Sequence, residues 1–136
     1  MNIFKKWKEL KEKWKRHSNV CDILNLTYDY ESIEIKKPII IDNVCIVKHD
    51  NDLIFFVKKD NWKKYIGINR DWLSDSQGND FSYDYLYKTS DLKNIIFCYK
   101  SDLPKEMFEE MFDELIKHKD DLKNVLEDKK KEEFYK

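Results

Sequence analysis

Residues 39–59 read IIIDNVCIVKHDNDLIFFVKK and predict a β-hairpin. The segments Ile39–His49 and Leu53–Lys59 are rich in β-branched and aromatic residues, which favour strands. The polar residues Asp50–Asp52 lie between them and are typical of a tight turn. Side chains alternate between the two faces of a strand. In the second strand one face therefore carries Leu53, Phe55 and Val57, and the other carries Ile54 and Phe56.

Further strands are expected on both sides of this hairpin. Upstream, apolar and polar residues alternate over 26–30 and again over 33–35, which indicates one or two strands. Downstream, Tyr65–Ile68, the tyrosines between 83 and 87, and a buried-looking run at Asn94–Tyr99 continue the pattern. The connections are too short for parallel crossovers, so we expect an antiparallel meander of about five strands within residues 26–99.

A helix is expected at each end of the meander. At about 100° per residue, the apolar side chains of residues 1–17 fall within an arc of about 120°, as in a helix that buries one stripe. Val20–Leu26 suggests a short second helix. Pro104 is typical of a first helical turn, and the apolar residues that follow predict a long helix over 104–126, kinked at Asp120–Asp121. Residues 127–136 read as a charged tail that frays.

These elements predict a single α+β domain over residues 1–136, with the long C-terminal helix packed on one sheet face. A chain of 136 residues can bury enough surface to fold without a metal or a disulfide. The three cysteines form no CxxC pair and follow no secretory leader, which favours a reducing cytoplasmic location. Heavy use of Lys, Asn, Ile and Tyr suggests an AT-rich gene from a low-GC bacterium or a phage.

Charge is distributed unevenly along the chain. Residues 1–17 carry seven positive and two negative side chains, a net charge of +5. The whole chain carries −1, so residues 18–136 carry −6. This basic helix predicts one candidate binding surface, whose residues are Lys5, Lys6, Trp7, Lys8, Lys11, Lys13, Trp14, Lys15 and Arg16.

The basic helix has several interpretations. Its Trp residues and lysines suit an anionic membrane interface, its cationic face suits nucleic acid, and its apolar stripe suits a groove in a partner or a second copy of the helix. The favoured interpretation is packing within the chain, with the stripe against the sheet or against the C-terminal helix. That helix is acidic, since residues 105–117 contain five carboxylates against two lysines.

A second candidate surface lies in residues 71–91, where acidic and aromatic residues are interleaved. Tyr and Trp dominate binding hot spots, and carboxylates attract a basic partner. The leading functional hypothesis is therefore a small inhibitor, of the immunity-protein or phage anti-defence type, that binds a basic nucleic-acid-handling protein. The alternative is a strand whose tyrosines cover the sheet beside a solvated loop. The predicted contact residues are Asp71, Trp72, Asp75, Asp80, Phe81, Tyr83, Asp84, Tyr85 and Tyr87.

No enzyme, metal site or cofactor is predicted. Cys45 and His49 share a strand face but lie about 13 Å apart at about 3.3 Å per residue, so a dyad requires strand pairing to bring Cys98 beside His49. His17 and Cys21 have helical spacing but lack further ligands. The remaining candidates are weaker: the Glu34–Lys36 triplet, the loop around Gly78, the turn residues Asp50 and Asp52, and His118 on the apolar stripe of the last helix.

Overall fold

The structure, a computed structural model, describes residues 2–70 and 85–134. Tyr85 is described by its backbone only. The described part is an α+β fold, as predicted, with a six-stranded antiparallel sheet in place of about five strands. Its elements in chain order are α1 (Ile3–Asp29), β1 (Ile39–Ile41), β2 (Val44–His49), β3 (Asp52–Val57), β4 (Tyr65–Ile68), β5 (Tyr85–Thr89), β6 (Ile96–Tyr99), η1 (Lys100–Asp102), α2 (Lys105–Lys117) and α3 (Lys119–Phe134).

The sheet follows the chain order, so each strand pairs with its sequence neighbours and β1 and β6 form the two edges. The predicted hairpin is confirmed: β2 and β3 pair from Val44↔Val57 to His49↔Asp52. Asp50 and Asn51 connect them with φ angles of 47° and 71°. Positive φ at both central residues is the two-residue turn that matches the twist of paired strands, and Asp and Asn tolerate it.

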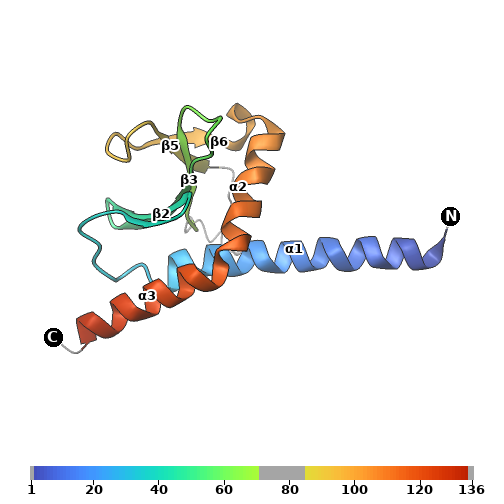
Figure 1. Cartoon of the computed structure of the whole chain (residues 1–136), viewed down its shortest axis with the longest axis horizontal. Helices are drawn as coiled ribbons and strands as arrows, with labels where there is room; N and C mark the ends of the chain where they lie inside the picture. Colours follow the sequence, from blue (N-terminus) through green and yellow to red (C-terminus); the bar gives the residue numbers. More distant parts are fainter. Residues whose placement is uncertain (1, 71–84, 135–136) are drawn as a thin grey trace, which may run out of the picture.

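Two apolar clusters lie on the two faces of the sheet. The larger one is formed by side chains of β2 to β6 and by the three helices, which lie on one side of the sheet (Figure 1). The smaller one lies on the opposite face, around Ile54 and Phe56. The central strand β3 contributes to both, which explains why Leu53–Val57 is apolar without interruption.

Gly67 in β4 is required by close packing in the smaller cluster. A Cβ atom at this position would lie 2.5 Å from Cδ1 of Phe56 and 2.8 Å from Cγ2 of Ile54. Both neighbours are fully buried and cannot move aside freely. We expect Gly67→Ala to lower the free energy of unfolding by about 1–3 kcal/mol, as measured by urea denaturation. Adding Phe56→Leu should restore part of the loss, whereas a Gly67→Ala protein at least as stable as the wild type would contradict this packing.

The first helix is longer than predicted. It runs without a break from Ile3 to Asp29, so the predicted end after residue 17, the separate short helix at Val20–Leu26 and the predicted strands over 26–30 and 33–35 are wrong. Helical spacing places one set of side chains on a single buried face. These residues are Val20, Ile23, Leu24 and Thr27. Thr27 also joins the helix to the sheet, because its Oγ1 accepts a hydrogen bond of 2.8 Å from the backbone N–H of Arg70, just beyond β4.

The C-terminal half also differs from the prediction. The expected helix over 104–126 is two helices, and the chain changes direction at His118 between α2 and α3 rather than kinking at Asp120–Asp121. The expected fraying tail is helical through Phe134. One reason is a contact at Glu127, in the middle of α3. Tyr30, just after α1, donates a hydrogen bond to the Glu127 carboxylate and so attaches α3 to this part of the chain.

Candidate functional site

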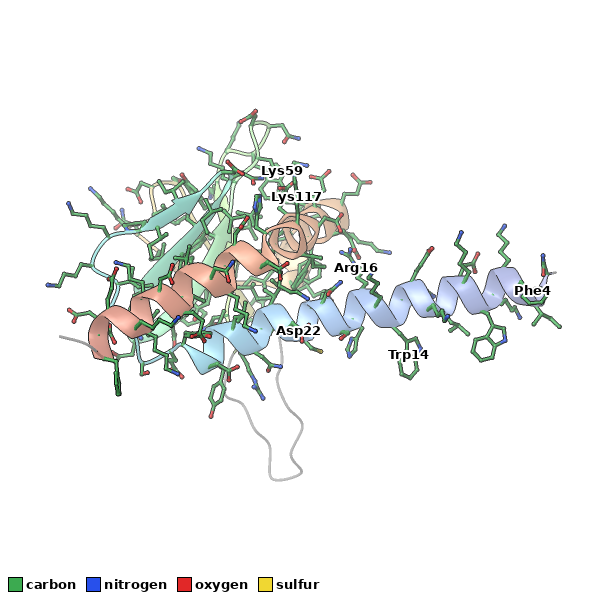
Figure 2. All side chains as sticks on the ribbon, turned by 60° about the horizontal axis from the view of Figure 1, so that its bottom comes forward. Phe4, Trp14, Arg16, Asp22, Lys59 and Lys117 are labelled. Atoms are coloured by element: carbon green, nitrogen blue, oxygen red, sulfur yellow. The ribbon has the colours of Figure 1, made fainter. Side chains whose placement is uncertain are left out.

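The first half of α1 extends beyond the rest of the molecule as a free helix (Figures 1 and 2). The side chain of Asn2 caps it by accepting a hydrogen bond of 3.0 Å from the N–H of Phe4. The large apolar side chains of this half all face solvent. Their exposed fractions are Ile3 70%, Phe4 82%, Trp7 64%, Leu10 51% and Trp14 76%. We name this set the exposed stripe. The prediction that it packs on the sheet or on the C-terminal helix is wrong.

The exposed stripe faces away from the domain because α1 has two apolar faces. At about 100° per residue, the centre of the stripe is rotated by roughly 140° from the face that the second half of the helix buries. A straight helix that packs its second half on the domain therefore turns its first half outward. The outward direction of the stripe is thus a consequence of residue spacing along one continuous helix, and it stays exposed among the described residues.

Arg16 fixes this orientation at the point where α1 leaves the domain. Its guanidinium forms ion pairs with two carboxylates of α2, Glu109 at 2.8 Å and Asp113. The hydrogen bond to Asp113 and the neighbouring negative charge raise the pKa of Arg16 above its ordinary value. Trp14 lies about 200° from Arg16 around the helix, and Figure 2 shows the two side chains on opposite sides of the ribbon. Basic α1 therefore does contact acidic α2, but through Arg16 and not through the stripe.

Cations border the exposed stripe on both sides. Around the helix, Lys6 and Lys13 flank one edge, Lys8 and Lys15 flank the other, and Lys11 lies within the apolar arc. Glu9 and Glu12 lie on the opposite side, toward α2. Every one of these side chains is exposed. The surface around the stripe is therefore positive, and its two carboxylates point the other way.

The predicted acidic aromatic surface is only partly testable. Residues 71–84 lie outside the described residues, and Tyr85 is described in its backbone alone. Tyr87 is 3% exposed, its hydroxyl donates a hydrogen bond of 3.0 Å to Asp52, and its ring lies 4.7 Å from that of Phe97. Its assignment to a binding surface is therefore wrong, because neighbouring side chains cover it. The rest of that surface, and the inhibitor function attached to it, stays a prediction.

Exposed aromatic side chains occur instead on the neighbouring strand β6. The run Asn94–Tyr99 was expected to be buried, but within β6 only Cys98 is, while Ile96, Phe97 and Tyr99 are exposed. The reason is position, since β6 is an edge strand. Its place as the last strand of a meander, directly before a helix, is the sequence signal that could have indicated an edge.

The predicted catalytic and metal-binding candidates are not brought together in the described part of the chain. Cys98 in β6 and His49 in β2 are separated by three strands, so strand pairing does not place them side by side. His17 and Cys21 do meet, with Nε2 and Sγ 3.6 Å apart. Residues 2–70 and 85–134 nevertheless hold no group of three metal-ligating side chains. His118 is buried at the α2–α3 junction, 3.5 Å from Asp121, as the packed residue that was expected.

The three thiols should differ strongly in reactivity. Burial raises the pKa of Cys45 and of Cys98, so both are thiols rather than thiolates at neutral pH, whereas Cys21 is half-buried on the outside of α1. We expect 5,5′-dithiobis(2-nitrobenzoate) at about pH 8 to modify one thiol rapidly and the other two only at the rate of unfolding. Peptide mapping should identify the fast thiol as Cys21. Fast modification of two or three thiols in the folded protein would contradict this assignment.

No helix within the described residues is long and apolar enough to cross a lipid bilayer. The exposed stripe, its lysine borders and the ion pairs of Arg16 together form the candidate functional site. Comparison of the chain with protein-family models, with curated proteins and with solved structures finds no match.

Proposed function

We propose that the protein binds anionic lipid surfaces peripherally, by laying the first half of α1 in the membrane interface. The observation that carries this proposal is an outward apolar stripe with exposed lysines along both borders. Helices of this kind lie in the interface plane with the apolar face among the upper acyl chains and the cations at the headgroups. Trp7 and Trp14 suit this depth, because an indole is apolar over most of its area and keeps one N–H for the polar layer.

The energetics are sufficient for reversible binding. Residues 3–14 span about 18 Å, and their stripe is rotated by roughly 140° from the packed face, so most of the domain lies away from the membrane. Burying each Trp side chain contributes about 2 kcal/mol, and each lysine near an anionic surface contributes about 1 kcal/mol. Ordering of the helix costs little, because its second half is already packed in the core. The proposal therefore needs no lipid anchor and no spanning segment.

A second copy of the helix is a poorer partner for the stripe. Ile3, Trp7, Leu10 and Trp14 have the alternating spacing of four and three residues found in a coiled-coil seam. The positions that flank such a seam are Phe4, Lys6, Lys11 and Lys13, and the three lysines would face one another across a self-pair. Like charges at these positions disfavour association of two copies.

Nucleic acid is also a poorer partner. Lysines could contact phosphates, but they lie on both sides of an apolar arc about 120° wide, so the large side chains between them would stay in water. A lipid surface accommodates the apolar arc and the cationic borders at the same time. The stripe and its borders therefore fit a membrane better than a polyanion.

The test is vesicle binding by the full chain. We expect co-sedimentation with vesicles of phosphatidylcholine and phosphatidylglycerol, and at least tenfold weaker binding to phosphatidylcholine alone. Tryptophan emission should shift to shorter wavelength on binding, because Trp7 and Trp14 leave water. Raising the salt concentration from about 0.1 M to about 0.5 M should weaken binding by screening the lysines. Equal binding to neutral and anionic vesicles, or no binding to either, would overturn the proposal.

A further inference from the structure

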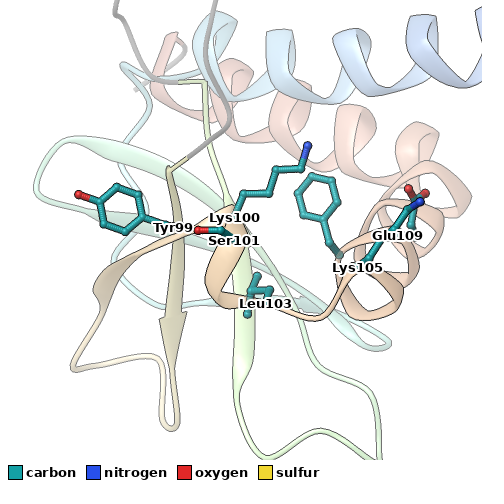
Figure 3. Close-up of a pocket in the computed structure, with 7 residues that line it drawn as sticks. Tyr99, Lys100, Ser101, Leu103, Lys105 and Glu109 are labelled. Carbon is teal, nitrogen blue, oxygen red and sulfur yellow. The ribbon is translucent and has the colours of Figure 1, made fainter.

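A crevice lies beside α1, between η1 and α2. Its wider part has a volume of about 630 Å³ and is lined mainly by η1 and by the start of α2, including Leu103 and Lys105. Its narrower part, about 250 Å³, reaches α1 and is lined there by Lys13 and His17. Lys100, Phe108 and Glu109 line both parts, so the two lie next to each other. Figure 3 shows Lys100 on the η1 side of the wider part and Lys105 and Glu109 on the α2 side.

The crevice combines a positive lining with an apolar floor. Among the described residues of the lining, cationic or ionisable nitrogen comes from Lys13, Arg16, His17, Lys100 and Lys105, and Glu109 is the one carboxylate. That carboxylate is already paired with Arg16 at 2.8 Å, so its charge is largely compensated within the protein. The ammonium of Lys100 lies 4.7 Å from the ring centre of Phe108, which holds the charge above the floor. Such a lining favours a ligand with a concentrated negative charge and an apolar continuation.

The narrow end of the crevice opens next to the exposed stripe. Of the α1 residues that line the narrow part, Arg16 and Val20 lie on the face packed on the domain, while Lys13 and His17 lie between that face and the edge of the stripe at Leu10. A membrane that contacts the stripe would therefore meet the mouth of the crevice at headgroup level. This position connects the crevice to the lipid surface and not to the far side of the domain.

We propose that the crevice binds the phosphomonoester headgroup of a single anionic lipid, with Lys13 and Lys100 holding the phosphate and Phe108 contacting the carbon chain behind it. This inference rests on the proposed function, because the lipid is delivered by the membrane that the stripe contacts. A phosphomonoester suits the site better than a phosphodiester, since it carries up to two charges and three acceptor oxygens for several cations. The same chemistry is found in a soluble phosphomonoester such as glycerol 3-phosphate.

The test compares two anionic lipids at matched surface charge. Vesicles with phosphatidic acid and vesicles with phosphatidylglycerol are adjusted to the same zeta potential, and binding of the full chain is measured on both. We expect about tenfold tighter binding to phosphatidic acid, the effect of one charge-assisted hydrogen bond that the diester lacks. Lys100→Gln should abolish this preference and change binding to phosphatidylglycerol no more than Lys93→Gln does. Lys93 is a matched control, since it is an exposed lysine that does not line the crevice.

A second measurement separates this inference from the proposed function. Titration of glycerol 3-phosphate without vesicles, followed by NMR, should shift the amide signals of Lys100 and Lys13 in the wild type and not in Lys100→Gln. If the protein binds both vesicle types equally and Lys100→Gln has no effect, the crevice is not a headgroup site even though the membrane proposal stands. If vesicle binding fails but glycerol 3-phosphate still shifts these signals, the crevice binds a soluble phosphomonoester and the lipid source is wrong. If no signal shifts and no preference exists, the inference is overturned.

Discussion

The double substitution Trp7→Ala and Trp14→Ala is expected to weaken binding to anionic vesicles by about a thousandfold and to leave the midpoint of thermal unfolding unchanged. Each indole that no longer enters the interface removes about 2 kcal/mol, and the two together remove about 4 kcal/mol. Stability is unaffected, because both side chains are largely exposed and touch little of the domain. Alanine also preserves the helix, so the loss cannot be attributed to unfolding of the free half of α1.

A matched control lies on the other side of the same half-helix. The control variant carries Glu9→Ala and Glu12→Ala. It therefore has two new alanines in the same segment, as the Trp variant does, but keeps the exposed stripe intact. We expect this variant to bind anionic vesicles at least as tightly as the wild type, because two negative charges are gone. Undiminished binding by a folded Trp7→Ala/Trp14→Ala protein would exclude the stripe as the contact surface. A fall of several degrees in its unfolding midpoint would mean that the stripe packs on the domain after all.

The angle of the stripe around α1 follows from residue spacing. The sequence alone nevertheless favours the wrong interpretation, which is that the stripe packs on the sheet or on the C-terminal helix. Ser18 and Asn19 resemble a helix end, and the alternation of Leu26, Tyr28 and Tyr30 resembles a strand. Both signals are local and weak, and the packing of Ile23 and Leu24 on the sheet overrides them. Once α1 is continuous to Asp29, the angle between its two apolar faces follows from residue spacing alone. What the sequence could not provide is which of the two faces meets the domain.

The tyrosines of β5 show a second limit of prediction from sequence, which concerns burial. Spacing of two placed Tyr85 and Tyr87 on one face of a strand, and the antiparallel order of strands from β2 to β6 was equally accessible from turn signals. Residue spacing does not show whether that face of the strand is exposed to solvent. Tyr87 is buried because its face carries a second apolar cluster with Phe56 and Ile54, and because Asp52 satisfies its hydroxyl. These are long-range contacts that no local pattern reports.

The same substitution at two positions of α1 should separate the two functions of this helix. Leu24 is fully buried in the main cluster, whereas Leu10 is 51% exposed in the stripe. We expect Leu24→Ala to lower the free energy of unfolding by about 2–5 kcal/mol, the cost of a core cavity, as measured by urea denaturation. Leu10→Ala should change that free energy by less than about 0.5 kcal/mol, because no cavity forms in water.

Vesicle binding should show the reverse order. Leu10→Ala is expected to weaken binding to phosphatidylglycerol vesicles by about tenfold, since a smaller apolar side chain enters the interface. Leu24→Ala should bind as the wild type does wherever it remains folded, which circular dichroism at the binding temperature establishes. Both variants gain the same helix-favouring residue, so propensity cancels in the comparison. If Leu10→Ala destabilised the fold as much as Leu24→Ala, α1 would be a core element over its whole length. The exposed stripe would then be buried and could not contact a membrane.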